Sequence, residues 1–150
     1  MRSGTLAVPL IVGMGKAAEL ARIDVESGAI EEVRRLRDLL YEAVADLDVV
    51  VNGSVEHRLP NNLNLAIPGV DAAALMMSMR QVAFSSGSAC ATSNLTASHV
   101  IMALTLPTEL HHTVIRFGIG RQNTEEEVRH VAALLRDKIP AIREMTRQAE

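Results

Sequence analysis

Apolar residues recur at intervals of three and four along the first third of the chain, which predicts helix from about Val8 to Leu47 with a weak point at Ser27–Gly28. The apolar stripe consists of Leu10, Ile11, Met14, Ala17, Ala18, Ala21, Ile30, Val33, Leu36, Leu40, Val44 and Leu47. Charged residues fill the other side of the second half, and we expect them to form solvated pairs four residues apart. These are Glu31, Glu32, Arg34, Arg35, Arg37 and Asp38.

Shorter patterns follow. Alternation and turn residues predict four short strands, at residues 48–53, 62–67, 82–84 and 113–119. Helices are predicted at residues 70–80, 98–104 and from residue 124 onward. Asp71 and Ser98 are expected to cap the first two, and Thr124 with Glu127 forms a capping box for the last, which Pro140 should kink. Helices flanking a small mixed sheet of about four strands make an α+β domain.

Composition narrows the class of protein. The chain has 150 residues, of which 48% are apolar and 22% charged, with a net charge of −3, so we expect one globular domain, residues 1–150. This charge gives no footprint for nucleic acid. No apolar run approaches the roughly 20 residues of a membrane span, and no signal peptide is recognisable. A single cysteine excludes an internal disulfide and a cysteine-based zinc site, and it fits a cytoplasmic protein.

That cysteine, Cys90, lies in a stretch of small and hydroxyl residues from Phe84 to His99. A lone cysteine is most often a small buried hydrophobe without chemistry. Here the neighbours are Ala89 and Ala91 rather than large apolar residues, and small residues cannot build a core. The stretch therefore predicts an accessible thiol on a long loop, which a nearby positive group would activate. His99, Arg116 and Arg121 are candidates.

Arg116 stands in an otherwise apolar predicted strand. Its guanidinium either points to the solvated face or binds a carboxylate through two parallel hydrogen bonds. The five histidines have no spacing typical of a metal site and are interpreted as surface or capping residues, and the place of His99 beside the loop also makes it a candidate to tune that loop: His57, His99, His111, His112 and His130. Asn61 and Asn64 are interpreted as loop and strand hydrogen-bonding groups.

Several of these stretches together resemble one family, and they occur in order along nearly the whole chain. They are Arg2-Ser-Gly-Thr5 with Ile11-Val-Gly-Met-Gly15, Pro60-Asn61 with Leu63-Asn64, Ser85-Ser-Gly-Ser-Ala-Cys90 with Ser98-His99-Val100, and Ile115-Arg-Phe-Gly-Ile-Gly-Arg121. The chain is similar to the C-terminal, small-domain part of the NifS/IscS-type cysteine desulfurases of the class V aminotransferase family. The resemblance implies the small domain of a fold-type I enzyme that uses pyridoxal phosphate.

The resemblance also implies roles. Cys90 would be the nucleophile that takes sulfur from L-cysteine as a persulfide, with release of alanine and transfer to an iron–sulfur scaffold or another acceptor. Arg116 would bind the substrate carboxylate. Thr5 would contact the cofactor phosphate in the neighbouring subunit of a homodimer, although it could instead be a helix N-cap.

One departure from the family limits the prediction. The family's cofactor lysine lies in a large domain that these residues lack, and the two lysines present, Lys16 and Lys138, occur on helical patterns in another context. We therefore expect a fragment or split-gene product that is inactive alone and needs a large domain supplied elsewhere. The alternatives are a non-enzymatic persulfide carrier or interaction module, and an inactive remnant.

Overall fold

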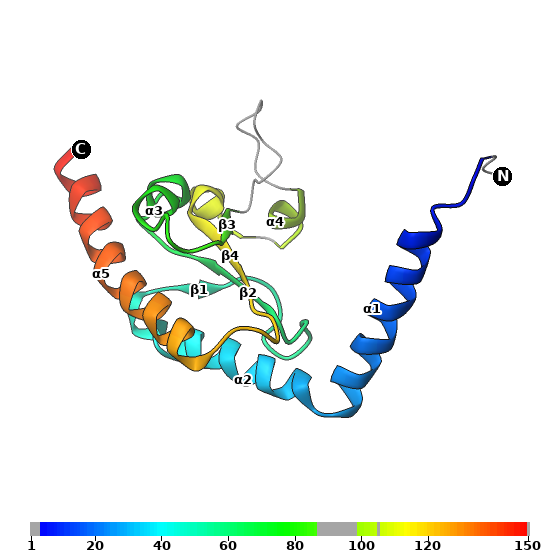
Figure 1. The fold of residues 1–150 in the computed structure, drawn as a ribbon. Helices are drawn as coiled ribbons and strands as arrows, with labels where there is room; N and C mark the ends of the chain where they lie inside the picture. The colour runs from blue at the N-terminus through cyan, green and yellow to red at the C-terminus, as the bar shows by residue number, and fades with distance from the viewer. Residues whose placement is uncertain (1–3, 87–98, 105, 150) are drawn as a thin grey trace.

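The structure is a computed structural model, and it describes residues 4–86, 99–104 and 106–149. Figure 1 shows a small sheet with helices α2 and α5 along one side and helix α1 extending away from the body. The elements in chain order are α1 (Val8–Glu26), α2 (Ala29–Glu42), η1 (Ala45–Leu47), β1 (Val50–Val51), β2 (Asn62–Ala66), α3 (Ala72–Ser78), β3 (Ser85–Ser86), α4 (His99–Ala103), η2 (Thr108–Thr113), β4 (Val114–Gly118) and α5 (Glu125–Ala149). The α+β class is confirmed.

The four strands are ordered β1-β2-β4-β3, and each described pair is antiparallel. The expected mixed sheet is therefore wrong in this detail, because β4 runs between β2 and β3 in the direction opposite to both. The third strand also begins later than residues 82–84. The Val82 amide donates to the Met79 carbonyl at 3.0 Å in a turn, so pairing with β4 starts only at Ser85.

The main core lies between the sheet and the helices α2 and α5. Alternate strand residues face the two helices, as a period of two requires. Buried residues from these elements include Val33, Leu36 and Leu40 of α2, Leu63 and Leu65 of β2, Ile115 and Phe117 of β4, and Val128, Leu135 and Ile139 of α5. The second half of the predicted stripe and the predicted apolar face of the last helix are confirmed.

The described residues cover the opposite face of the sheet only in part. Ala66 and Val114 face each other across β2 and β4 and are buried beneath Ile101 of α4, with Leu106 and Leu110 packed around them. This small cluster covers one end of the face. The next pair of residues on the same face, Asn64 and Arg116, lies beside the cluster.

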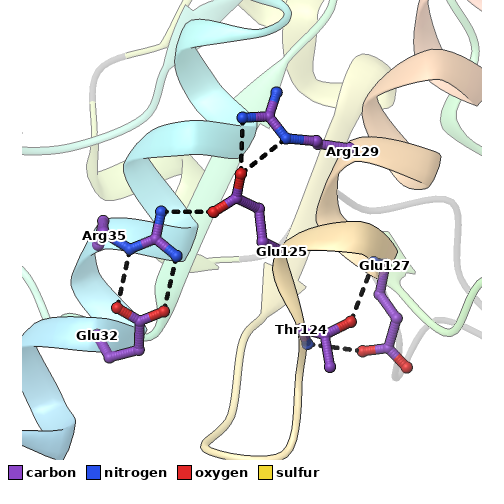
Figure 2. Close-up of polar contacts among 6 residues, drawn as sticks. All are labelled: Glu32, Arg35, Thr124, Glu125, Glu127 and Arg129. Carbon is purple, nitrogen blue, oxygen red and sulfur yellow. Dashed lines mark hydrogen bonds and ion pairs between the residues drawn. The ribbon is translucent and has the colours of Figure 1, made fainter.

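Ion pairs between exposed side chains join α2 to α5. Figure 2 shows Glu125 between two arginines, with Oε2 at 2.9 Å from Arg35 of α2 and Oε1 at 2.7 Å from Arg129. Arg35 also pairs with Glu32 at 2.7 Å. Hydrogen bonds from Arg129 and Arg35 lower the pKa of Glu125, and the hydrogen bond from Arg35 lowers the pKa of Glu32.

The caps predicted for α3 and α5 are present. Thr124 Oγ1 accepts from the Glu127 amide at 3.2 Å, and Glu127 Oε2 accepts from the Thr124 amide at 3.0 Å, which is the expected capping box (Figure 2). The Asp71 side chain accepts from the Ala74 amide at 2.9 Å. Helix α5 continues through Pro140 to Ala149.

The predicted weak point between α1 and α2 is a sharp bend. Gly28 has a φ of 79°, a left-handed conformation that favours glycine. Helix α1 has no buried residue, and apolar side chains such as Leu10 and Met14 are 76% and 71% exposed. One ion pair, Arg121 Nη1 to Asp24 Oδ2 at 2.7 Å, ties its end to the loop after β4. No helix in the described part of the chain is long and apolar enough to cross a membrane.

One predicted surface charge is buried. Arg37 is only 5% exposed, although the helical pattern placed it on the solvated side of α2. The loop between β1 and β2 covers it: Nη1 lies 3.5 Å from the Leu59 carbonyl oxygen, and Nη2 pairs with Asp38 at 2.6 Å. The pairs of Glu31 with Arg34 and of Glu32 with Arg35 are exposed as expected, but their members lie three residues apart rather than four.

Candidate functional site

A row of polar residues crosses all four strands on the sheet face opposite the main core. Arg116 of β4 faces Asn64 of β2 on one side and Ser85 of β3 on the other. The Asn52 amide, just after β1, donates to the Asn64 carbonyl at 2.9 Å, which extends the row to the first strand. Directly opposed residues have their Cβ atoms about 5 Å apart, so these side chains are neighbours. The row lies beside the Ala66–Val114 pair that α4 covers.

Arg116 is exposed between the buried residues Ile115 and Phe117. Its side chain makes no hydrogen bond or ion pair with any residue that the structure describes. Since the guanidinium keeps its water, its place in an apolar strand carries no burial cost. A fork of N–H donors on an open surface can accept a carboxylate in two parallel hydrogen bonds.

Two asparagines form the end of the row nearest β1. Asn52 Nδ2 donates to Asn64 Oδ1 at 2.8 Å, and Asn52 is only 7% exposed. Asn52 was not identified from the sequence, where it reads as the first residue of an Asn-Gly turn. Arg58 secures the loop that follows, with Nη2 donating to the Asn52 carbonyl at 2.8 Å and Nε to the Ser54 carbonyl at 2.6 Å. Burial, and next the charge of Arg37, lowers the pKa of Arg58.

Cys90 lies outside the described residues, but both attachments of its segment are described. On one side is β3, in which Ser85 pairs with Arg116 and Ser86 with Ile115. Phe84, just before β3, places its ring 5.2 Å from the ring of Phe117. On the other side is α4, which begins at His99. The segment that carries Cys90 therefore departs from the strand next to Arg116 and returns to the helix that packs on the same face.

The other predicted partner cations are placed differently. His99 is exposed at the start of α4, whereas Arg121 is paired with Asp24. Among the described residues, no group of three or more metal-ligating side chains is close enough to hold an ion.

Thr5 lies far from this row. It is exposed ahead of α1, where it lines a shallow hollow of 290 Å³ formed by residues 4–7 and the first turns of the helix. The N-cap of α1 is Ala7 and has no side-chain capping bond, so the alternative role of Thr5 as that cap is wrong. Figure 1 shows α1 extending away from the sheet, so that the start of the helix is its most distant part. Thr5 and Arg116 of one copy therefore do not share a site.

The described residues do not fit a complete pyridoxal phosphate site. Lys16 is on α1 and pairs with Glu19 at 2.9 Å, and Lys138 is on α5 and pairs with Asp137 at 2.8 Å. Helix α5 packs against the other face of the sheet and α1 extends away from the sheet, so neither amine faces Arg116 (Figure 1). A lysine able to bind the cofactor aldehyde beside this row is absent from the described residues.

A second hollow, of 460 Å³, lies at the bend between α1 and α2. Apolar residues such as Ile30, Leu59 and Ile119 line most of it. Its charged residues, Asp24 and Arg121, pair with each other, so this hollow offers no unpaired charge to a ligand.

Comparison with known proteins identifies the family. The model of the aminotransferase class-V family matches residues 1–131. The chain belongs to this family. Among curated members, the cysteine desulfurase IscS of Anaeromyxobacter sp. (strain Fw109-5) is 50% identical over 147 residues, and that of Tolumonas auensis is 44% identical. Each match covers 97% of this chain but 36% of the relative, so the chain spans about a third of the length of these relatives.

Solved structures of NifS-like proteins agree with the fold. A NifS-like protein superposes with a TM-score of 0.74 at 27% identity, over 96% of this chain and 35% of the other. A NifS-like protein from Rickettsia africae superposes with a TM-score of 0.79 over 93% of this chain and 36% of the other, and at 24% identity it supports the fold alone. The predicted resemblance to part of a NifS/IscS-type protein is confirmed.

Proposed function

We propose that this chain is the part of a cysteine desulfurase that supplies the sulfur-accepting thiol, Cys90, and the substrate-binding arginine, Arg116. The observation that supports it most is the pairing of Ser85 with Arg116, because β3 directly precedes in sequence the residues that include Cys90, and the Arg116 guanidinium has no partner among the described residues. The names of the IscS relatives, at up to 50% identity, support the same activity.

Arg116 binds the carboxylate of L-cysteine on the open face of the sheet and so holds the substrate near β3. The thiolate of Cys90 takes the substrate's sulfur, which leaves a persulfide on the protein and releases alanine. The persulfide then passes to an iron–sulfur scaffold protein or another acceptor. When bound, pyridoxal phosphate supplies an electron sink to this reaction, and its lysine belongs to a large domain outside these residues.

Helix α1 supports the need for further protein. Its apolar side chains are exposed along its whole length, and a face of this kind on a folded protein marks an interaction surface. We assign it to the large domain and to the second subunit of a homodimer, where Thr5 contacts the cofactor phosphate in the partner's site. The cytoplasm is the proposed compartment, because the thiol has to remain reduced.

A persulfide carrier without catalytic activity is the second candidate. The absence of a suitably placed lysine among the described residues favours it, since a carrier needs only the thiol and a docking surface for its donor. An inactive remnant is the third.

The test is incubation with L-cysteine of the purified chain, alone and with a polypeptide that carries the family's large domain loaded with pyridoxal phosphate. Alanine is quantified, and Cys90 is examined by mass spectrometry for the addition of one sulfur atom. Alanine and the adduct should appear only in the mixture, and Cys90→Ser should lose both, whereas Ser85→Ala should keep the adduct.

The alternatives give different results. An adduct that forms from a persulfide donor protein, with no alanine in any mixture, would establish the carrier. Alanine production by the isolated chain would contradict the expected dependence on a large domain. Absence of the adduct under all these conditions would overturn both functions.

A further inference from the structure

Asn64 lies directly opposite Arg116 and offers hydrogen-bond donors that nothing described uses. The register of β2 and β4 pairs the two residues, and the Asn64 side chain is half-buried on the same face. Its Oδ1 already accepts from Asn52 Nδ2 at 2.8 Å, on the β1 side. The amide nitrogen is on the other edge of the planar group, so it points away from β1. Its two N–H donors have no partner among the described residues.

Asn52 fixes the orientation of the Asn64 amide, and it does so while one of its own buried polar atoms is left without a hydrogen bond among the described residues. It is 7% exposed, and its own Oδ1 has no hydrogen-bond partner in the described part of the chain. A buried acceptor left unsatisfied is unfavourable, and groups of this kind in folded proteins call for an explanation. An apolar residue of similar size would avoid the cost. It would also release Asn64, because Asn52 is the group that fixes its amide.

The chemistry of a carboxylate matches this arrangement. Two carboxylate oxygens offer about four acceptor positions, of which a guanidinium fork uses two. An adjacent amide N–H can occupy a third and so fix the rotation of the carboxylate about the axis of the fork.

We propose that Asn64 is a second substrate-carboxylate ligand beside Arg116, and that Asn52 is a positioning residue that orients it. The inference rests on the proposed function, in which an amino-acid carboxylate binds Arg116. It adds the residue that fixes how this carboxylate is turned, and therefore the direction in which the rest of the amino acid points.

The test is titration of the isotope-labelled 150-residue chain with L-alanine, followed by NMR of the Asn64 side-chain amide and the Arg116 Nε–H group. Ethylamine, which lacks the carboxylate, is the control ligand. Both signals should move with L-alanine and stay in place with ethylamine. Asn64→Ala should weaken binding about tenfold, as the loss of one hydrogen bond to a charged group predicts.

Asn62→Ala is the matched control. Asn62 has the same side chain on the same face of β2, but it faces Gly118, and its replacement should leave affinity within about twofold, because diagonal neighbours lie about 7–8 Å apart. Asn52→Leu should weaken binding as Asn64→Ala does while the melting temperature stays the same or rises. A purely structural role for Asn52 would instead lower the melting temperature and leave affinity unchanged.

The outcomes separate this inference from the function on which it rests. Equal affinities for Asn64→Ala and Asn62→Ala, with binding lost in Arg116→Ala, would overturn the role of Asn64 alone. Binding of L-alanine that survives Arg116→Ala, or no binding by the unaltered chain, would overturn the carboxylate site itself.

Discussion

Two arginines show how much a single residue's place depends on contacts from distant parts of the chain. Arg116 is exposed although its strand is apolar, because it alternates with Ile115 and Phe117, which face the core. Arg37 is buried although its helix face is charged, because the loop containing Leu59 lies over it. The first could be anticipated from the period of a strand. The second could not, since no local pattern reports which loop will cover a helix.

The same limit applies to the candidate site. Cys90 and Arg116 were identified from composition and from the family's motifs, whereas Asn52 was missed and Asn64 was interpreted only as a strand residue. Their significance comes from the antiparallel register, which places Asn64 opposite Arg116 and Asn52 beside Asn64. Register depends on pairing between segments far apart in sequence.

At this scale the capping box of α5 gives a direct prediction. Thr124→Ala removes the side-chain acceptor for the Glu127 amide and should lower the free energy of unfolding by about 1 kcal/mol. Denaturant unfolding followed by circular dichroism measures the change. Thr108→Ala is the control, because Thr108 is exposed and makes no side-chain hydrogen bond with described residues, and it should change stability by less than about 0.5 kcal/mol.

At the scale of elements, periodicity predicted most helices and strands but not their burial. Helices α1 and α2 share one apolar stripe in the sequence, yet α2 packs on the sheet and α1 has no buried residue. Strand β3 was placed too early, because its two serines have no alternation to reveal them. Strand direction was also missed, since side-chain period is the same in parallel and antiparallel pairs.

The difference between the two helices can be measured with one type of substitution. Leu36 of α2 is 2% exposed and Leu20 of α1 is 37% exposed. Leu36→Ala should lower the free energy of unfolding by about 2–5 kcal/mol, as truncation in a packed core does. Leu20→Ala should cost less than about 1 kcal/mol, because a surface position leaves no cavity. Similar losses in urea denaturation would show that α1 is packed in solution.

The ion pairs between α5 and the segment formed by α2 and η1, here called the seam, predict a dependence of stability on pH. Arginine hydrogen bonds lower the pKa of Glu32, Glu125 and Asp46, the last through Arg136. The folded state therefore binds these protons less readily than the unfolded state. The resulting stability is complete above the ordinary carboxyl pKa, near 4.5 for the two glutamates, and is lost as the pH falls through the lowered values.

Arg35→Met should therefore flatten the loss of stability below about pH 5, measured as melting temperature against pH. The control is Arg22→Met, because Glu26 on the exposed helix α1 is the one ion-pair partner of Arg22 among the described residues. An identical pH profile in Arg35→Met and the unaltered chain would contradict a role for this seam, as would insensitivity of the profile to high salt.

For the whole molecule, the exposed helix α1 predicts self-association. Ile11 and Met14 are 47% and 71% exposed, and their replacement by glutamate should disrupt contacts between copies without affecting the core. Sedimentation velocity should show a concentration-dependent larger species for the unaltered chain and a monomer for the double variant. Unfolding free energies of the two should agree within about 0.5 kcal/mol when measured at low concentration.

The bend at Gly28 has a mechanical consequence for Thr5. Helix α1 has 19 residues, so it forms a rigid lever arm of about 28 Å between the bend and its first turn. A tilt of about 10° at this pivot would displace the far end by about 5 Å, which is more than a hydrogen-bond length. The position of Thr5 relative to the sheet therefore depends on the backbone conformation of Gly28. It also depends on the Asp24–Arg121 ion pair, which lies at the opposite end of α1 from Thr5.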